Sequence, residues 1–501
     1  MRLHRLSAPL FDRRVPSHLA FFQLALDRLH ELPRDPEPRL RDFFAPDVGV
    51  HIARAPGRLD VMGGIADYSG ATVLQLPLDC ATVAILQRHV APRCDLATHR
   101  GGQWEFFSID MDSLITGELH DPLALAAWFE NRPADQWAAY VVGTIQRCLQ
   151  HRDGDRPSAH PGMRMLIESN VPEGKGVSSS AALEMASMAV VAASYDVALT
   201  PEQLALDCQW VENHIVGAPC GIMDQMTSVC GRSDRLMRLK CQPGTIEGHI
   251  EIPAGFAFFG IDSGLRHAVT GADYGTVRTA AFMGYRMVAD AADLRAEPDG
   301  AHVRVTDPRW NGYLANIAPS EFSDLYKMLL PVSMSGSEFL PRYGGITDEV
   351  TRVHPERRYP VRHATAHPVF EQHRVERFAD LLGELGQAPN VVVEMGRLMH
   401  GSHESYSACG LGTEGTDRLV ELVAEAGSPR GLFGAKITGA GSGGTVAVFG
   451  RDDAESVVRE IAERYAVESG RAAQVFADSG PGAQETGVLY VDPVAWTVST
   501  S

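Results

Sequence analysis

A glycine- and serine-rich stretch from Pro172 to Glu184 has the composition of a loop that binds an anion. It follows residues 163–169, where apolar and polar side chains partly alternate as in a half-buried strand, and it leads into an Ala-, Met- and Leu-rich run that favours a helix. The first backbone N–H groups of a helix have no partner within the helix, and the helix dipole is positive at that end. We therefore expect a phosphate group to bind where this loop meets the helix.

Single residues of the loop support this chemistry. Gly174 and Gly176 let the backbone approach a ligand closely, and Ser178–Ser180 can cap the helix or place a hydroxyl on a metal ion carried by the phosphates. The loop is not a Walker A motif, because Lys175 is followed by glycine, and its glycine spacing differs from that of a dinucleotide fingerprint. An ordinary capped helix after a turn remains the alternative interpretation of these residues alone.

Three stretches resemble motifs of the GHMP small-molecule kinases, which include the galacto-, homoserine, mevalonate and phosphomevalonate kinases. The loop at Pro172–Ala182 resembles their phosphate loop, Ala55–Gly70 resembles the sugar-binding signature of galactokinases, and Lys436–Gly444 resembles the third family motif. The three stretches occur in the family order. This resemblance implies an α+β fold of two domains, the first ribosomal-S5-domain-2-like and the second ferredoxin-like, with the active site in the cleft between them.

On this basis we divide the chain into three parts. Residues 1–45 form an N-terminal helical extension, residues 46–245 form the N-terminal kinase domain with the sugar signature and the phosphate loop, and residues 246–501 form the C-terminal kinase domain. The sequence indicates no role for residues 1–45 or 335–375.

Local patterns predict the elements that carry these motifs. Residues 71–86 favour paired strands, and residues 280–375 favour a mixture of helices and Pro- and Arg-rich loops. Further helices are expected near 18–31, 134–148, 181–191, 201–216, 277–291, 320–330, 375–385, 391–400, 416–425 and 454–466, and further strands near 256–262, 435–438, 445–449 and 487–490.

The resemblance implies ATP as the phosphoryl donor and Mg²⁺ as its companion ion. It assigns the metal to Ser180 and Glu212, with Ser179 as an alternative to Ser180 and a solvated helix face as the alternative for Glu212. Trp137 lies in a Trp-x-x-Tyr-Val-x-Gly run that galactokinases carry near the adenine pocket; a place in the core is its alternative. The nucleotide contacts implied for the loop are Pro172, Gly174, Lys175, Gly176, Val177, Ser178, Ser179, Ser180 and Ala181.

Asp224 is the candidate residue that faces the sugar hydroxyl, because Cys220–Gln225 matches the galactokinase run Cys-Gly-Ile-Met-Asp-Gln residue for residue. Arg58 would lie beside it and stabilise charge. A carboxyl group of ordinary pKa, near ~3.9, is a poor base toward a sugar hydroxyl in the ground state. Asp224 would therefore orient the hydroxyl and accept its proton late, as the transition state forms. A helix N-cap is the alternative role, and one residue can serve both.

The sugar signature departs from that of galactokinases. They normally carry Gly-Glu-His-Thr-Asp-Tyr, whereas this chain has Gly-Gly-Ile-Ala-Asp-Tyr at residues 63–68. The Glu and His serve mainly the C6 hydroxymethyl group of the sugar, so a C6 hydroxyl here would be buried without partners at a cost of about 1–3 kcal/mol. L-Arabinopyranose is galactose without that carbon. The implied sugar contacts are Gly64, Ile65, Asp67, Tyr68 and Tyr274.

Three runs, Gly57–Gly70, Gly271–Tyr274 and Ser405–Gly412, also resemble the kinase portion of plant L-arabinokinases, over roughly residues 48–480. We expect no counterpart here of the glycosyltransferase-like part that precedes the kinase in the plant proteins. The expected activity is ATP-dependent phosphorylation of L-arabinose at the anomeric hydroxyl. A kinase for galactose or another sugar is the nearest alternative. A catalytically silent sugar sensor is the other, although such proteins often lose part of the phosphate loop.

Composition limits the partners. The formal net charge of −18 argues against a nucleic acid or an anionic membrane surface, which leaves ATP and a small sugar as the expected partners. The eight cysteines are scattered without a Cys-x-x-Cys pair, as is typical of reduced thiols in a cytoplasmic protein. We expect a cytoplasmic protein without a secretory leader or a membrane-spanning run. The sequence does not indicate an oligomeric state.

Overall fold

The computed structural model describes residues 1–6, 17–152, 162–265 and 272–493. Its first layer is a nine-stranded mixed sheet in the order β1-β17-β2-β3-β6-β4-β5, with β7 paired to β3 and β8 paired to β7. The strands are β1 Leu3–Leu6, β2 Val50–Met62, β3 Thr72–His89, β4 Arg93–Arg100, β5 Gln103–Asp110, β6 Gly162–Ser169, β7 Arg235–Lys240, β8 Thr245–Glu251 and β17 Val488–Val491.

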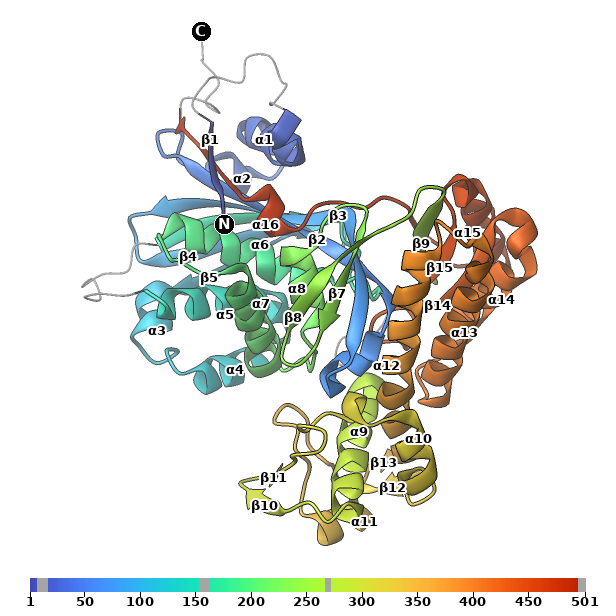
Figure 1. Cartoon of the computed structure of the whole chain (residues 1–501). Coiled ribbons are helices and arrows are strands. Elements are labelled where there is room, and N and C mark those ends of the chain that lie inside the picture. Colours follow the sequence, from blue (N-terminus) through green and yellow to red (C-terminus); the bar gives the residue numbers. More distant parts are fainter. Residues whose placement is uncertain (7–16, 153–161, 266–271, 494–501) are drawn as a thin grey trace.

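Helices cover both faces of this sheet (Figure 1). The lower face in the figure carries the larger apolar core, to which Met165, Val190 and Cys208 contribute. Its helices are α3 Met111–Ile115, α4 Pro122–Glu130, α5 Gln136–Gln150, α6 Ser179–Ser194, α7 Pro201–Val211, η5 Glu212–Val216, α8 Met223–Cys230 and α16 Ala483–Thr486. The N-terminal extension packs on the opposite face with η1 Ser17–Phe22, α1 Gln23–Glu31, η2 Leu32–Arg34 and α2 Pro38–Arg41.

A second sheet of four strands lies beside the first, in the order β14-β15-β9-β16. A core that includes Leu74, Phe378 and Phe449 joins the two sheets, so apolar burial fixes the domains against each other. The strands are β9 Phe256–Asp262, β14 Leu432–Ile437, β15 Thr445–Arg451 and β16 Val475–Phe476, and the helices are α12 Val361–Glu384, α13 Val392–Ala408, α14 Glu414–Ala426 and α15 Glu455–Ser469.

Residues 272–360 form a separate lobe at the bottom of Figure 1, which we call the α9 lobe. Its core includes Tyr285, Phe322 and Phe339, and it also takes in Ile65 and Tyr68 of the sugar signature. The elements of the lobe are α9 Ala272–Ala291, β10 Ala296–Asp299, β11 His302–Val305, η6 Leu314–Asn316, α10 Pro319–Glu321, η7 Phe322–Tyr326, β12 Met334–Ser335, α11 Gly336–Tyr343 and β13 Arg358–Tyr359.

Two local predictions are wrong. Residues 72–86 of the predicted 71–86 strand pair lie within one continuous strand, β3, because this strand pairs with β2, β6 and β7 along its length. The Pro- and Arg-rich residues after 360 form the start of α12, which continues through Pro368. A proline removes one helical hydrogen bond; α12 tolerates this loss because it packs on α9 and α13 and buries side chains along its length.

The sheets also show where the domains begin and end. The sequence places a boundary between residues 245 and 246, whereas β8 still pairs within the first sheet and the second sheet begins with β9. Near the other end, β17 returns to pair with β2 and β1. Among the described residues, no helix combines the length and the apolar character needed to cross a membrane.

Candidate active site

Most of the predicted site residues meet at one cavity of about 100 Å³ between the sheet domain, the second domain and the α9 lobe. The sugar signature, the phosphate loop, the 217–222 loop, α8 and α9 each contribute to its wall. The lining residues are Arg58, Asp67, Gly174, Gly176, Ser178, Ser179, Ser180, Glu212, Ala218, Pro219, Cys220, Gly221, Met223, Asp224, Tyr274 and Ala440.

The phosphate loop has the backbone that an anion site needs. Gly174, Gly176 and Ser178 have φ values of 69°, 72° and 62°, and α6 begins directly after them at Ser179. Among the described residues, the buried Ser178 hydroxyl has no hydrogen-bond partner. A buried polar atom without a partner is costly, and this one lines the cavity at a helix N-terminus, where a phosphate oxygen would satisfy it.

Contacts from both domains hold this loop in place. The Arg58 N–H donates to the Val177 carbonyl at 3.1 Å, and the Thr445 hydroxyl donates to the Lys175 carbonyl at 2.8 Å. The Lys175 ammonium lies 2.9 Å from the Asp262 carboxylate on β9. Lys175 and Val177 therefore position the loop in this structure, and neither side chain lines the cavity.

Arg58 joins the phosphate loop to the candidate catalytic carboxylate. Irregularities in the pairing of β2 with β3 occur at Pro56/Arg58 and Asp60/Met62, and such bulges re-aim side chains. The Arg58 Nη1 donates to the Gly176 carbonyl at 2.6 Å, while Nε donates to Asp224 Oδ1 at 2.9 Å. Asp224 lies in the first turn of α8, as predicted. One buried guanidinium thus fixes the separation between the anion loop and this carboxylate.

Asp67 faces the same space as Asp224. Burial, together with the nearby Asp224 carboxylate, raises the pKa of Asp67 to about 7. Its Oδ1 accepts a hydrogen bond from the Tyr68 N–H at 2.6 Å. Gly221 packs so closely that an added Cβ would lie 1.7 Å from Asp67 Oδ2. Two carboxyl groups and the Tyr274 ring therefore surround one polar end of the cavity, which suits a polyhydroxylated ligand.

Glu212 and Ser180 provide oxygen ligands on the other side. The Ser180 hydroxyl donates a hydrogen bond to Glu212, and burial raises the pKa of Glu212 to about 7. Hard oxygen donors on a buried carboxyl group fit Mg²⁺, which also neutralises the charge there. Across residues 1–6, 17–152, 162–265 and 272–493, no group of three or more His, Cys, Asp or Glu side chains forms a metal cage. A magnesium ion here would therefore need oxygen atoms of the nucleotide phosphates as further ligands, beside those of Ser180 and Glu212.

Two buried residues behind Glu212 were missed by the sequence analysis. Gln225, next to Asp224, donates from Nε2 to Glu212 Oε2 at 2.7 Å and to Glu184 Oε2 at 3.3 Å. Burial, with the Glu212 charge second, raises the pKa of Glu184 well above its ordinary value. A lone glutamate within the Ala- and Met-rich helix α6 was the available signal.

Several predicted residues lie away from the cavity. Trp137 is buried in the α5 core with its ring centroid 6.4 Å from that of Phe107, so the core alternative holds in this structure. The other residues that do not line the cavity are Gly64, Ile65, Tyr68, Pro172, Lys175, Val177 and Ala181. Tyr68 still packs edge-on against Tyr274 at 5.9 Å.

The structure explains why residue 64 is a glycine. A Cβ on Gly64 would lie 1.6 Å from the Tyr406 hydroxyl. That hydroxyl accepts from the Ile65 N–H at 2.9 Å and donates to the Gly439 carbonyl at 2.9 Å. Behind it, Lys436 and Asp60 form a 2.7 Å ion pair with both side chains 0% exposed. This corner of the sugar signature is closed, and Tyr406, Asp60 and Lys436 are paired there. Among the described residues, the buried hydroxyl of Tyr68 has no hydrogen-bond partner.

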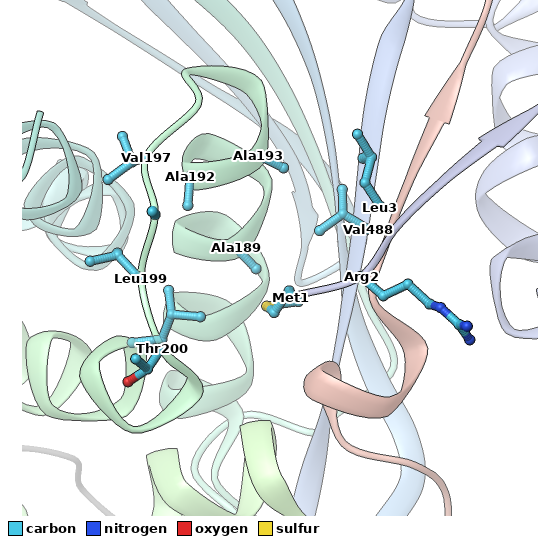
Figure 2. Close-up of a pocket in the computed structure, with 12 residues that line it drawn as sticks. Met1, Arg2, Leu3, Ala189, Ala192, Ala193, Val197, Leu199, Thr200 and Val488 are labelled. Carbon is cyan, nitrogen blue, oxygen red and sulfur yellow. The ribbon is translucent and has the colours of Figure 1, made fainter.

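A larger cavity of about 420 Å³ lies elsewhere, between α6, the 197–200 segment, the edge strand β1 and its neighbour β17 (Figure 2). Small apolar side chains such as Ala189, Ala192 and Val488 line it, and among its lining residues Arg2 has the one charged side chain. Because it lacks convergent polar groups, it offers no chemistry comparable to that of the smaller cavity.

Two family models and a plant protein match this chain. Residues 139–232 match the family model for the GHMP kinases N terminal domain, and residues 388–467 match the model for the GHMP kinases C terminal domain. The L-arabinokinase of Arabidopsis thaliana is 38% identical over 93% of this chain and 50% of the plant protein, so the chain spans about half the length of this relative.

The crystal structure of Lactococcus lactis galactokinase complexed with galactose is similar in fold. It superposes with a TM-score of 0.66 at 19% identity, covering 92% of this chain and 98% of that chain. At this identity the likeness concerns the fold alone, and it confirms the expected two-domain α+β architecture.

Proposed function

Because this chain carries both domains of the GHMP kinase family and belongs to it, we propose that it is an ATP-dependent sugar-1-kinase that phosphorylates the anomeric hydroxyl of L-arabinose. The observation that carries the proposal is the Arg58 bridge, which holds the Asp224 carboxylate and the phosphate loop on one cavity. The name of the Arabidopsis thaliana relative, L-arabinokinase, supports the choice of sugar.

The site residues divide the reaction between them. The loop amides around Gly174 and Gly176 and the free Ser178 hydroxyl would bind the nucleotide phosphates. A magnesium ion on Ser180 and Glu212 would neutralise charge on the transferred phosphoryl group. Phosphoryl transfer of this kind depends mainly on positioning and on charge stabilisation.

Asp224 would receive the sugar hydroxyl. Its carboxylate is aimed into the cavity by Arg58, at 2.9 Å from Nε. It would orient the anomeric hydroxyl toward the phosphate loop and accept its proton as the bond to phosphorus forms. Asp67 and Tyr274 line the same end and would contact the ring hydroxyls. This division leaves one carboxylate for the nucleophile and one for recognition.

The closed corner at Gly64 favours a pentose. Ile65 is 1% exposed and lies in the core of the α9 lobe, and Tyr406 fills the space beside Gly64. The nearby ions Asp60 and Lys436 satisfy each other and do not line the cavity. A hydroxymethyl group directed at Gly64 would meet the Tyr406 hydroxyl, which is already bonded, and would find both charged groups, Asp60 and Lys436, paired with each other, which disfavours galactose by about 1–3 kcal/mol.

A panel of sugars tests the proposal. The purified protein is assayed with ATP and L-arabinose, D-galactose and further aldoses, and ¹³C and ³¹P NMR assign the phosphate position. We expect the highest kcat/KM with L-arabinose and phosphate on C1. A higher kcat/KM for galactose would point to a galactokinase. Sugar binding without any turnover would point to a silent sensor.

A further inference from the structure

The α9 lobe carries a buried ion pair directly behind a loop that lines the cavity. Arg278 on α9 donates from Nε to Asp348 Oδ2 at 2.8 Å and from Nη2 to Asp348 Oδ1 at 2.8 Å. The two side chains are 7% and 5% exposed. A bidentate pair of this kind fixes both position and orientation of the guanidinium.

Asp348 is itself held rigidly in a turn. Its Oδ2 accepts from the Thr351 hydroxyl at 2.7 Å, and its Oδ1 accepts from the Val350 N–H at 3.3 Å. Burial alone would raise the pKa of Asp348, but the Arg278 guanidinium and these donors hold it below its ordinary value. The turn thus presents a fixed anionic partner to α9.

The third guanidinium nitrogen of Arg278, Nη1, contacts a loop that lines the cavity. This nitrogen donates to the Cys220 carbonyl at 2.9 Å, and Cys220 and Gly221 line the cavity. From the opposite side, Asn213 Oδ1 accepts from the Cys220 N–H at 2.8 Å. The 217–222 loop is therefore clamped between the sheet domain and the α9 lobe.

This loop sets the sugar end of the cavity. Gly221 lies against Asp67 with no room for a side chain, and the loop leads directly into α8, which carries Asp224. Arg278 also lies 5.5 Å from the centre of the Tyr68 ring, and Tyr274 one turn earlier on α9 lines the cavity. Other residues, namely Arg58, Thr445 and Asp262, hold the phosphate loop.

We propose that Arg278 and Asp348 are a positioning pair through which the α9 lobe holds the 217–222 loop in the conformation that binds the sugar. This inference rests on the proposed function and gives Asp348, within residues 335–375, a role that the sequence did not indicate. We expect the pair to affect binding of the sugar and not binding of the nucleotide, because no contact of Arg278 or Asp348 reaches the phosphate loop.

The test separates binding of the two substrates. In Asp348→Asn, Arg278 loses its charged partner, and we expect the Kd and KM for the preferred sugar to rise at least about tenfold. The Kd for ATP, measured by calorimetry without sugar, should change less than about threefold. A matched control is Asp35→Asn, which breaks the buried Arg28–Asp35 pair of 2.7 Å in the N-terminal extension. It should lower stability and leave the sugar Kd unchanged.

A second variant covers the case in which Asp348→Asn does not fold. Replacing both partners, as Arg278→Met with Asp348→Leu, removes the buried charges and can preserve stability, yet it still removes the donor to the Cys220 carbonyl. We expect a folded protein with normal ATP binding and a sugar Kd that stays raised. A sugar Kd equal to that of the wild type in this double variant would overturn the inference, as would an equal loss of ATP and sugar affinity in Asp348→Asn.

The failure of the proposed function is recognisable in the same experiment. A wild-type protein that binds ATP but no sugar would overturn the proposed function, and the inference with it, before any variant is compared. A wild type that binds sugar, with variants that bind it equally well, would overturn only the inference.

Discussion

The hydroxyl of Tyr406 occupies the place where a side chain on Gly64 would have to begin. A Cβ at residue 64 would lie 1.6 Å from that oxygen, which is bonded at 2.9 Å to the Ile65 N–H and at 2.9 Å to the Gly439 carbonyl. The glycine in the sugar signature and the tyrosine of α13 therefore form one unit. This relationship explains why a run near residue 406 accompanies the altered signature in the resemblance to L-arabinokinases.

A double-mutant cycle tests this unit. Gly64→Ala should destabilise the protein by about 1–3 kcal/mol because the new methyl group overlaps Tyr406. Tyr406→Phe should cost about 1–3 kcal/mol because the Ile65 N–H and Gly439 carbonyl lose their partner. The double variant should lose less than the sum, since removing the hydroxyl relieves the overlap. Urea unfolding measures all four proteins.

The control for this cycle is Gly383→Ala. An added Cβ at Gly383 in α12 meets nothing within 4 Å, so this change should not destabilise the protein. Strictly additive losses in the Gly64 and Tyr406 variants would show that the two residues do not oppose each other.

The Lys175–Asp262 pair is predicted to act through the loop backbone. The ammonium lies 2.9 Å from the carboxylate, and the two side chains are 16% and 6% exposed. Lys175→Met and Asp262→Asn should each weaken ATP binding about three- to tenfold, and the double variant should lose no more than either single one. Calorimetry with ATP gives the values.

The Asp262→Asn variant distinguishes an indirect role of Lys175 from direct contact with a phosphate. If Lys175→Met weakened ATP binding while Asp262→Asn left it unchanged, the lysine would be a direct phosphate ligand. Asp299→Asn, at an exposed ion pair with Arg304 in the α9 lobe, should leave ATP binding as it is in the wild type.

The sequence predicted the parts of this site that depend on neighbouring residues, but not the contacts between residues far apart in the chain. The loop of Gly174 and Gly176 and the helix start at Asp224 are local patterns, and the structure places all three on one cavity. Position 64 and Tyr406, or Arg278 and Asp348, lie far apart in the chain, and a single sequence holds no signal that pairs them. Such partners become visible only when the fold brings them together.

Helix α12 and Trp137 show a second limit. The sequence predicted a mixture of helices and Pro- and Arg-rich loops up to residue 375, but packing on α9 and α13 keeps α12 continuous through Pro368. Trp137 lies in a motif that resembles an adenine-pocket run, yet its ring packs in the α5 core. In both cases tertiary burial decided a question that the local sequence left open.

The titration of Asp67 predicts a pH dependence of stability. Burial raises its folded pKa to about 7 from an ordinary value of 3.8, so between these values the folded protein holds a proton that the unfolded chain has lost. Stability therefore falls as the pH rises from about 4 to about 7, by up to roughly 1.4 kcal/mol per pH unit for this group. Above that range the contribution is constant.

Asp67→Asn removes this titration. Unfolding free energies at pH 5, 6, 7 and 8 should decline less steeply in the variant than in the wild type, and its sugar affinity should fall because a ring-hydroxyl acceptor is lost. Identical slopes for the two proteins would mean that Asp67 is ionised in the folded state throughout this range.

Asp224 is predicted to serve the chemical step. Asp224→Asn keeps the shape of the side chain but removes the charge that faces Arg58, and kcat should fall about 10²- to 10⁴-fold. ATP binding should remain, since Arg58 still donates to the Gly176 carbonyl. Rapid-quench measurement of a single turnover isolates this step from product release. A variant with wild-type single-turnover rates would remove Asp224 from the reaction.

A competition experiment examines the pentose assignment without comparing separate assays. Wild-type protein receives limiting ATP and equal concentrations of ¹³C1-labelled L-arabinose and D-galactose, and NMR follows both anomeric carbons. The closed corner at Gly64 and the carboxylate of Asp224 predict that most of the phosphate appears on C1 of L-arabinose. Phosphate mainly on galactose, or on any carbon other than C1, would contradict the account.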